Sequence, residues 1–317
     1  MEGVVDFHMR KILTEIGGID GCVTEFIRVT NHALPSRVFL KHFPEILSDC
    51  ETEHRVPVSV QLLGSNPEAI ALNAVKASKI GAKTIDLNFG CPAKTVNKSE
   101  GGAILLKKTD TLFKIVSTTK QSLPQGVKLS AKMRLGYEEK IGFLENAQAL
   151  ESAGAEELVV HARSKVDGYK PPAYWSYVKA IQEQLSINVI INGEIWTVDD
   201  YFKARDQSGC VDVMIGRGLL AKPDLALQIK CALNGEPIEA MPWCKVAHYV
   251  LRYFLQTTYT HPNKFLGNRL KQWLSYLKLT YPEAHVLMED IKRSRDFDFI
   301  HNRLRIEINN NKIDATI

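Results

Sequence analysis

Short apolar runs rich in β-branched residues alternate with helix-like segments along the first two thirds of the chain. Each run is closed by glycine or polar residues, as the strands of a buried sheet are. This pattern predicts seven strands, at Thr24–Val29, Val56–Leu63, Thr84–Leu87, Lys128–Met133, Leu158–His161, Asn188–Ile191 and Val211–Ile215. Apolar residues three or four positions apart predict helices between them, including Asn66–Ile80, Thr109–Ser122, Gly142–Ala153, Trp175–Leu185 and Val198–Arg205.

The alternation of strands and helices indicates repeated β-α units and a parallel sheet. Such units build either an open doubly wound sheet, which gathers its ligands at one switch point, or a (β/α)8 barrel, which collects them around one rim. Polar residues lie at or just past the end of nearly every predicted strand, at Gln61, Asn88, Lys132, Arg134, His161, Arg163, Asn192, Gly193, Gly216 and Arg217. We therefore predict an α/β fold, a TIM barrel over residues 1–236.

A barrel of this kind needs an eighth strand. The segment Met1–Asp6 is too short and too turn-like to be one, yet it suits the residues that follow a first strand. We therefore expect the chain as given to begin just after that strand, with the strand itself encoded upstream.

The last quarter of the chain has a different pattern. Residues 237–242 read as a linker, because glycine and proline interrupt any helix there. Beyond it we predict a small all-helical domain over residues 243–317, with helices at Val246–Thr257, Phe265–Leu279, Glu283–Ser294 and Phe297–Ile308. This domain holds 12 Lys and Arg against 7 Asp and Glu, so the net charge of the whole chain, +4, comes from here. Such a basic excess fits a surface for a polyanion, and it also fits an ordinary solvated helical surface.

The composition is that of an ordinary globular protein, with 45% hydrophobic and 24% charged residues among 317. The six cysteines form no C-x-x-C pair, which favours neither a zinc site nor a disulfide framework. No apolar run approaches the ~18 residues of a membrane span, and the amino terminus lacks the pattern of a signal peptide. We expect a cytoplasmic protein with no metal and no membrane partner.

Two glycine motifs predict a phosphate site. Asn192-Gly193-Glu194 and Gly216-Arg217-Gly218 close the last two predicted strands, where barrels commonly bind phosphate through backbone N–H groups. The second motif also satisfies G-x-G-x-x-A, but no second strand with an acidic end follows it, as the dinucleotide fingerprint requires. A mononucleotide such as FMN suits this arrangement better than a dinucleotide.

Lys132, His161 and Gln61 occupy matching positions at strand ends. A cation at this rim can stabilise a reduced, anionic flavin, and a histidine can donate a hydrogen bond to the same region or to a substrate carbonyl. Each residue alone could equally be an ordinary surface or packed side chain. Together they predict a flavin edge.

Cys91 lies in a sharp turn, Asn88-Phe89-Gly90-Cys91-Pro92, directly after an apolar run. Most single cysteines are small buried hydrophobes, and that interpretation stays open for this one. If a flavin lies across the barrel mouth, however, the thiol can donate a proton to a substrate stacked on it. A thiol with an unperturbed pKa of about 8.5 is protonated at neutral pH, as a general acid must be.

These motifs, in this order, resemble the tRNA-dihydrouridine synthase family. The resemblance covers nearly the whole chain and rests on M-E-G-V-V-D, V-Q-L-L-G, D-L-N-F-G-C-P-A-K, A-K-M-R-L-G, V-V-H-A-R, N-G-E-I and M-I-G-R-G. The segments N-G-E-I-W, M-P-W and R-L-K-Q-W-L-S-Y-L are similar to the bacterial C-type subgroup, which acts on uridine 16 of the tRNA D-loop.

The resemblance implies an FMN-dependent reduction of uridine to dihydrouridine with NADPH, or NADH, as reductant. Hydride would reach C6 from reduced FMN, and Cys91 would protonate C5. The family's FMN contacts would fall on Met1, Glu2, Gln61, Lys132, His161, Asn192, Gly193, Glu194, Gly216 and Arg217. Contacts to tRNA would fall on Arg28, Asn88, Tyr169, Arg269, Lys271, Gln272, Tyr276 and Lys292. We expect a monomer.

Two alternative functions remain at this point. A barrel flavoprotein could reduce a free pyrimidine, as dihydroorotate dehydrogenases do, although the basic helical region would then have no task. The chain could also bind tRNA without redox activity. Family members begin with a short strand ending in Ala-Pro, which this sequence lacks, so we expect weaker FMN retention than in a version extended upstream.

Overall fold

The computed structural model describes residues 3–260 and 262–310. The chain divides into two compact units. Asp20–Gly216 form the first, and Gly3–Ile19 join the described residues from Arg217 onward in the second. The units therefore meet along the chain after Ile19 and after Gly216. The domain boundaries at 236 and 242 remain a prediction.

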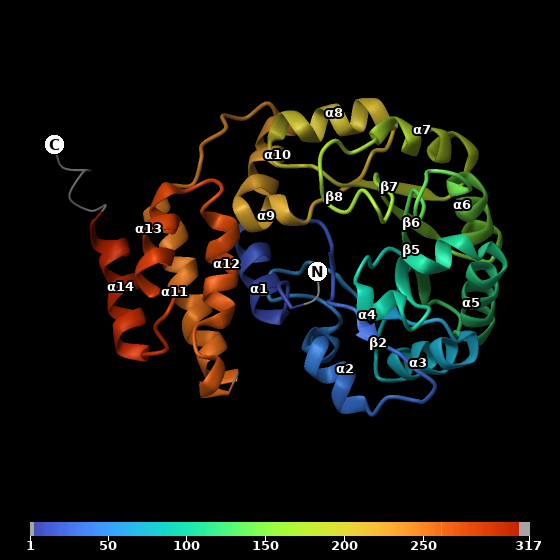
Figure 1. Cartoon of the computed structure of the whole chain (residues 1–317), viewed down its shortest axis with the longest axis horizontal. Helices are drawn as coiled ribbons and strands as arrows, with labels where there is room; N and C mark the ends of the chain where they lie inside the picture. The colour runs from blue at the N-terminus through green and yellow to red at the C-terminus, as the bar shows by residue number, and fades with distance from the viewer. Residues whose placement is uncertain (1–2, 261, 311–317) are drawn as a thin grey trace. The chain divides into compact units, whose positions relative to one another are not determined.

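The first unit is built on a parallel sheet (Figure 1). Its described strands are β1 Cys22–Val23, β2 Ile27–Arg28, β3 Val58–Leu63, β4 Thr84–Asn88, β5 Lys128–Arg134, β6 Glu157–His161, β7 Asn188–Asn192 and β8 Val213–Met214. They run in the order β1-β3-β4-β5-β6-β7-β8, with β2 also paired to β3. The curled parallel sheet confirms the predicted TIM-barrel class.

Helices connect these strands and lie outside the curled sheet (Figure 1). The main connecting helices are α3 Pro67–Lys79, α5 Thr109–Ser122, α6 Phe143–Ser152, α7 Trp175–Gln184 and α8 Val198–Ser208. Shorter helical pieces are α2 Ser36–His42, η1 Pro44–Ser48, α4 Lys94–Asn97 and η2 Gly102–Lys107. The five longer helices match the predicted ones within three residues at each end, because their apolar periodicity is unbroken.

The predicted strand Thr24–Val29 is instead two short strands, which is a correction to the sequence interpretation. Val23 lies opposite Ser59 and Ile27 lies opposite Leu62, so this side has one residue more than β3. The side-chain oxygen of Thr24 accepts a hydrogen bond from the backbone N–H of Gln61 at 3.0 Å, which replaces a backbone acceptor. The extra residue is therefore absorbed in a bulge.

Residues alternate along each strand between two environments, as the period of two requires. Ile85 and Leu87 of β4 belong to the main hydrophobic core, in which sheet and helices pack together. Asp86 and Asn88 alternate with them on the opposite face. One inward row of the sheet is polar throughout, and strand register aligns Gln61, Asp86, Ser130, Glu157 and Asn188. This inner face carries the site.

The second unit is helical. Its elements are α1 Phe7–Ile16, α9 Arg217–Ala221, α10 Leu225–Asn234, α11 Trp243–Thr260, η3 Asn263–Phe265, α12 Asn268–Leu277, α13 Pro282–Ile291 and α14 Phe297–Asn310. The α12 residues Leu270, Trp273, Leu274 and Leu277 are all buried in its core. The predicted apolar face of α12 is therefore confirmed. No helix of the part of the chain described here is long and apolar enough to cross a membrane.

Candidate active site

The carboxyl ends of β3 to β7 bring several predicted site residues together in the first unit. Strand register places Asn88 beside Lys132, and it places His161 between Arg134 and Asn192. These side chains alternate with buried apolar residues that face the helices, so they all emerge on the inner face. The spacing of polar residues at strand ends was the signal that identified them.

A chain of side-chain hydrogen bonds connects the strands β3, β4 and β5. Ser130 Oγ donates to Asp86 Oδ1, and Gln61 Nε2 donates to Asp86 Oδ2, both at 2.7 Å. Asn88 Nδ2 donates to Gln61 Oε1 at 2.7 Å. Asn88 Oδ1 then accepts from the backbone N–H of Gly90 at 2.9 Å. We call Ser130, Asp86, Gln61, Asn88 and Gly90 the Asp86 network.

Lys132 is half-buried, and its Nζ donates to Asn192 Oδ1 at 2.8 Å. Burial, and after it the positive charge of Arg134, lower the pKa of Lys132 to about 7, while the carboxylate of Asp86 acts in the opposite direction. Burial also raises the pKa of Asp86, against the hydrogen bonds from Ser130 and Gln61. An anionic ligand at this position would therefore stabilise the protonated lysine.

Cys91 is half-buried, whereas Cys50 and Cys210 are fully buried. Its backbone carbonyl accepts hydrogen bonds from the N–H of Ala103 and from Asn97 Nδ2, each at 3.0 Å. Gly102 approaches so closely that a Cβ there would lie 2.8 Å from this carbonyl oxygen. The residues that follow Cys91, from Asn97 to Ala103, thus hold the turn that carries the thiol.

The loop after β7 approaches His161 closely. Gly193 has φ +118°, and a Cβ at this position would lie 2.7 Å from His161 Cδ2. Trp175 Nε1 donates to the Gly193 carbonyl at 2.9 Å. Glu194 accepts from Trp196 Nε1 at 2.9 Å and pairs with the buried guanidinium of Arg163. Only glycine fits between the strand end and the imidazole.

Arg134 is a residue whose role sequence reasoning left unassigned. It is buried, and its Nε donates to the carbonyl of Gly90 at 2.8 Å, next to Cys91. Its guanidinium lies 5.3 Å from the centre of the Tyr169 ring, and that ring lies 6.0 Å from the His161 ring. Arg134 therefore supports both the cysteine turn and the exposed tyrosine. Its position two residues after Lys132, on the same face of β5, was the available signal.

Other predicted residues lie elsewhere. Arg28 ends β2 and donates to Ser99 Oγ, so it holds the loop that follows Cys91. Gly216 follows β8, and α9 begins at Arg217. Met1 and Glu2 lie outside the described residues.

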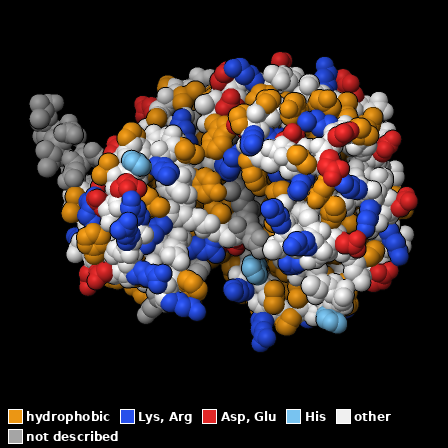
Figure 2. All heavy atoms as spheres, viewed as in Figure 1, with side chains coloured by type: hydrophobic (Ala, Val, Ile, Leu, Met, Phe, Trp, Pro, Cys, Tyr) orange, Lys and Arg blue, Asp and Glu red, His pale blue; other side chains and the backbone are white. Residues whose placement is uncertain are grey.

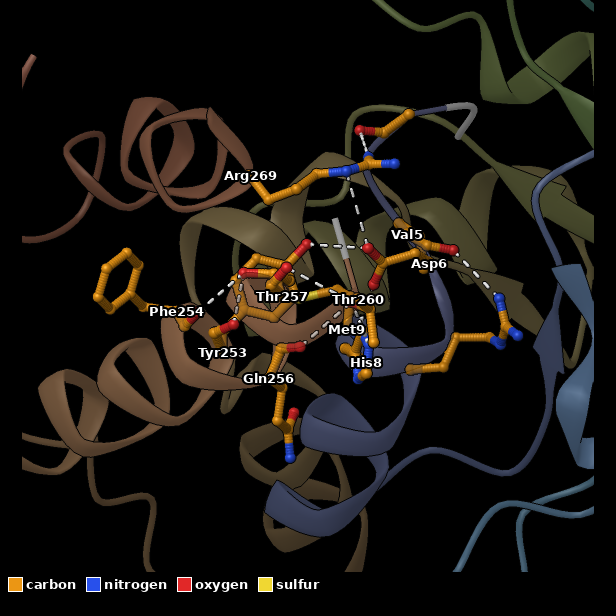
Figure 3. A network of polar contacts seen from close by, with 12 residues as sticks. Val5, Asp6, His8, Met9, Tyr253, Phe254, Gln256, Thr257, Thr260 and Arg269 are labelled. Atoms are coloured by element: carbon orange, nitrogen blue, oxygen red, sulfur yellow. Dashed lines mark hydrogen bonds and ion pairs between the residues drawn. The ribbon is translucent and has the colours of Figure 1, made fainter. Parts of the chain in front are cut away.

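The predicted tRNA residues of the second unit make internal contacts. Arg269 forms an ion pair with Asp6 at 3.8 Å and donates to the carbonyl of Gly3, as Figure 3 shows. Lys271 Nζ donates to the carbonyl of Ser294 at 2.6 Å, and burial lowers the pKa of Lys271. Their common function within the unit is to hold neighbouring segments.

A groove of about 660 Å³ lies beside these residues, lined by Gly3, Phe265, Asn268, Arg269, Lys271, Gln272, Ser275 and Met288. Tyr276 is half-buried and packs against the core of this unit. Lys292, which directly follows α13, forms an ion pair with Glu289 of that helix. Lys and Arg side chains gather on the C-terminal helices in Figure 2. The groove brings Arg269, Lys271 and Gln272 together.

Polar side chains gather at the carboxyl ends of the parallel strands, which is where TIM-barrel enzymes have their active sites. The family model described as dihydrouridine synthase matches residues 1–312 of this chain. The chain therefore belongs to the dihydrouridine synthase family, flavin-dependent oxidoreductases that reduce uridine to dihydrouridine in tRNA.

Curated relatives are similar along nearly their whole length. A tRNA-dihydrouridine(16) synthase of Aquipseudomonas alcaligenes is 47% identical over 306 residues, which cover 96% of this chain and 97% of the relative. A protein of the same name from Pseudomonas syringae pv. tomato is 48% identical, with 95% of each chain covered. One from Neisseria meningitidis serogroup A is 44% identical over 98% of this chain and 94% of the relative.

Proposed function

We propose that this enzyme reduces uridine 16 in the D-loop of tRNA to 5,6-dihydrouridine. The relatives named for position 16 support this choice of nucleotide. The structural observation that carries the chemistry is the half-buried Cys91, held in its turn by Ala103, Asn97 and Arg134. A fixed, accessible thiol beside a polar rim is what proton donation to a bound base requires.

We propose FMN as the cofactor, reduced by NADPH or NADH. The close approach of Gly193 to His161 holds the imidazole in place at the strand ends. Among the described residues, Arg163 Nη1 is buried without a hydrogen-bond acceptor, which suits a site that takes an anionic group. Bound and reduced, FMN would supply the hydride. The residues that would hold it are Gln61, Lys132, His161, Asn192, Gly193, Glu194, Gly216 and Arg217, together with Met1 and Glu2 outside the described residues.

In this proposal Cys91 donates its proton to C5 of the uridine, and C6 receives the hydride. The C5=C6 double bond is lost, and the resulting thiolate regains a proton from water. Lys132 would provide positive charge and His161 a hydrogen bond where negative charge develops. Asn88 contributes to holding the turn from which the thiol projects.

The tRNA would be bound by two groups of residues. Arg28, Asn88 and Tyr169 would meet the target nucleotide, and the exposed ring of Tyr169 offers a face for a base turned out of its stack. Arg269, Lys271, Gln272, Tyr276 and Lys292 would contact the body of the tRNA, chiefly through phosphates. We also infer that the enzyme acts in the cytoplasm, as a monomer and without a metal.

A direct assay tests the proposal. The purified protein is incubated with FMN, NADPH and unmodified tRNA, and dihydrouridine is mapped by position. We expect dihydrouridine at position 16 and none in a tRNA whose uridine 16 is replaced by cytidine. Reduction of free uracil or orotate, or tRNA binding without any dihydrouridine, would contradict the proposal.

A further inference from the structure

Asp86 is a buried carboxylate in the site that proton and hydride transfer do not use. It is 2% exposed and lies on the inner face of β4, between Gln61 on β3 and Ser130 on β5. Burial of an acidic group is costly unless its oxygens are hydrogen-bonded. Here each oxygen accepts one hydrogen bond at 2.7 Å, from Ser130 and from Gln61.

An ionised carboxylate only accepts hydrogen bonds, and this sets the direction of the whole network. Because Asp86 accepts, the Nε2 group of Gln61 must turn toward it and Oε1 must turn away. Gln61 Oε1 then accepts from Asn88 Nδ2, which leaves Asn88 Oδ1 to accept from the N–H of Gly90. The orientation of both amides thus follows from one charge.

We propose that Asp86 is a positioning residue that orients the amides of Gln61 and Asn88 for the flavin and for the cysteine turn. The inference rests on the proposed function, in which Gln61 touches FMN. It also explains why a carboxylate occupies a place in the inner row where an asparagine would have the same size. An asparagine could donate to Gln61 Oε1, so both amide orientations would become available.

The test measures FMN binding to the flavin-free protein by quenching of flavin fluorescence. We expect Asp86→Asn to weaken FMN binding about tenfold, the effect of one misdirected hydrogen bond. The matched control is Glu157→Gln, because Glu157 is a carboxylate in the same register row and accepts its hydrogen bond from Asn188 Nδ2. Affinity in this control should stay within about twofold.

A double-mutant cycle with Gln61→Ala separates positioning from general packing. If Asp86 acts through Gln61, Asp86→Asn should change affinity less than about twofold once Gln61 is alanine. Full additivity of the two substitutions would contradict the inference. If Asp86→Asn does not fold, Ser130→Ala replaces it in the same cycle, with about threefold weakening expected for loss of one neutral donor.

The two proposals fail in different ways. If the wild-type protein binds FMN and Asp86→Asn binds it with the same affinity, the positioning role alone is overturned. A wild-type protein that makes dihydrouridine without binding FMN at this site would overturn the positioning role and the cofactor assignment while leaving the reaction. A wild-type protein that neither binds FMN nor forms dihydrouridine would overturn both.

Discussion

Cys91 is the single residue on which the proposed chemistry depends. We expect Cys91→Ala to lower dihydrouridine formation at least about 100-fold, the usual contribution of a general acid. Reduction of the flavin by NADPH should persist, because that step does not need the thiol. Product in tRNA and flavin absorbance measure the two steps separately. Cys231→Ala is the control, since Cys231 is a half-buried cysteine on α10, and equal activity of both variants would exclude Cys91 as the acid.

The low pKa of Lys132 predicts how stability depends on pH. Between about pH 7 and the ordinary lysine pKa of 10.5, the unfolded lysine keeps a proton that the folded one has lost. The free energy of unfolding should therefore rise with pH in this window, by up to about 1.4 kcal/mol per pH unit from this group. Asp86, whose pKa is raised, acts in the opposite direction from about pH 4 upward.

Comparison with Lys132→Met isolates the contribution of the lysine. Urea unfolding of the flavin-free protein from pH 7 to 9 should show a smaller rise in the variant than in the wild type. The same slope in both proteins would mean that Lys132 keeps its ordinary pKa.

At the scale of the element, the turn after β7 depends on a glycine. Gly193→Ala should lower the free energy of unfolding by about 1–3 kcal/mol, since the residue has positive φ and its Cβ would collide with His161. FMN binding should weaken as well, because the imidazole must shift. Thermal melts and flavin fluorescence measure these two effects.

Gly126→Ala separates strain from collision. Gly126 also has positive φ, +87°, but a Cβ there meets nothing within 4 Å. We expect this variant to lose stability and keep its flavin. If Gly193→Ala also keeps full FMN affinity, the glycine serves the backbone turn alone.

At the scale of the whole molecule, tRNA binding tests the basic helical region. Arg269→Ala and Lys271→Ala should each weaken binding and reduce the slope of log affinity against log salt by about one, if each neutralises one phosphate. Filter binding across a range of salt concentrations measures both quantities. Lys203→Ala, which removes an exposed lysine paired with Asp199 on α8, is the control.

These two residues also hold internal contacts, so melting temperatures must accompany the binding data. Arg269 pairs with Asp6, and Lys271 donates to Ser294. Binding that weakens with an unchanged salt slope would indicate that the side chains support the fold of this unit and do not contact phosphate.

Local pattern was enough to predict the main elements and the strand ends at which the candidate site residues lie. The helix Thr109–Ser122 has the predicted bounds, because its apolar spacing depends on residues within a few positions of one another. The rim residues Lys132, His161 and Asn192 were located for a similar reason, since strand ends can be read along the chain.

Contacts between distant residues could not be predicted in this way. The bulge at Thr24 exists because its hydroxyl meets Gln61 on β3, and the pairing of Arg269 with Asp6 joins residues 263 positions apart. Trp175, at the start of α7, donates to Gly193 in the loop after β7, and the sequence neighbours of Trp175 give no sign of this. The sequence by itself thus determined the barrel's elements, its polar rim and the turn that carries Cys91. Only the tertiary structure decided the strand register and the Asp86 network, because hydrogen bonds between strands depend on partners far away along the chain.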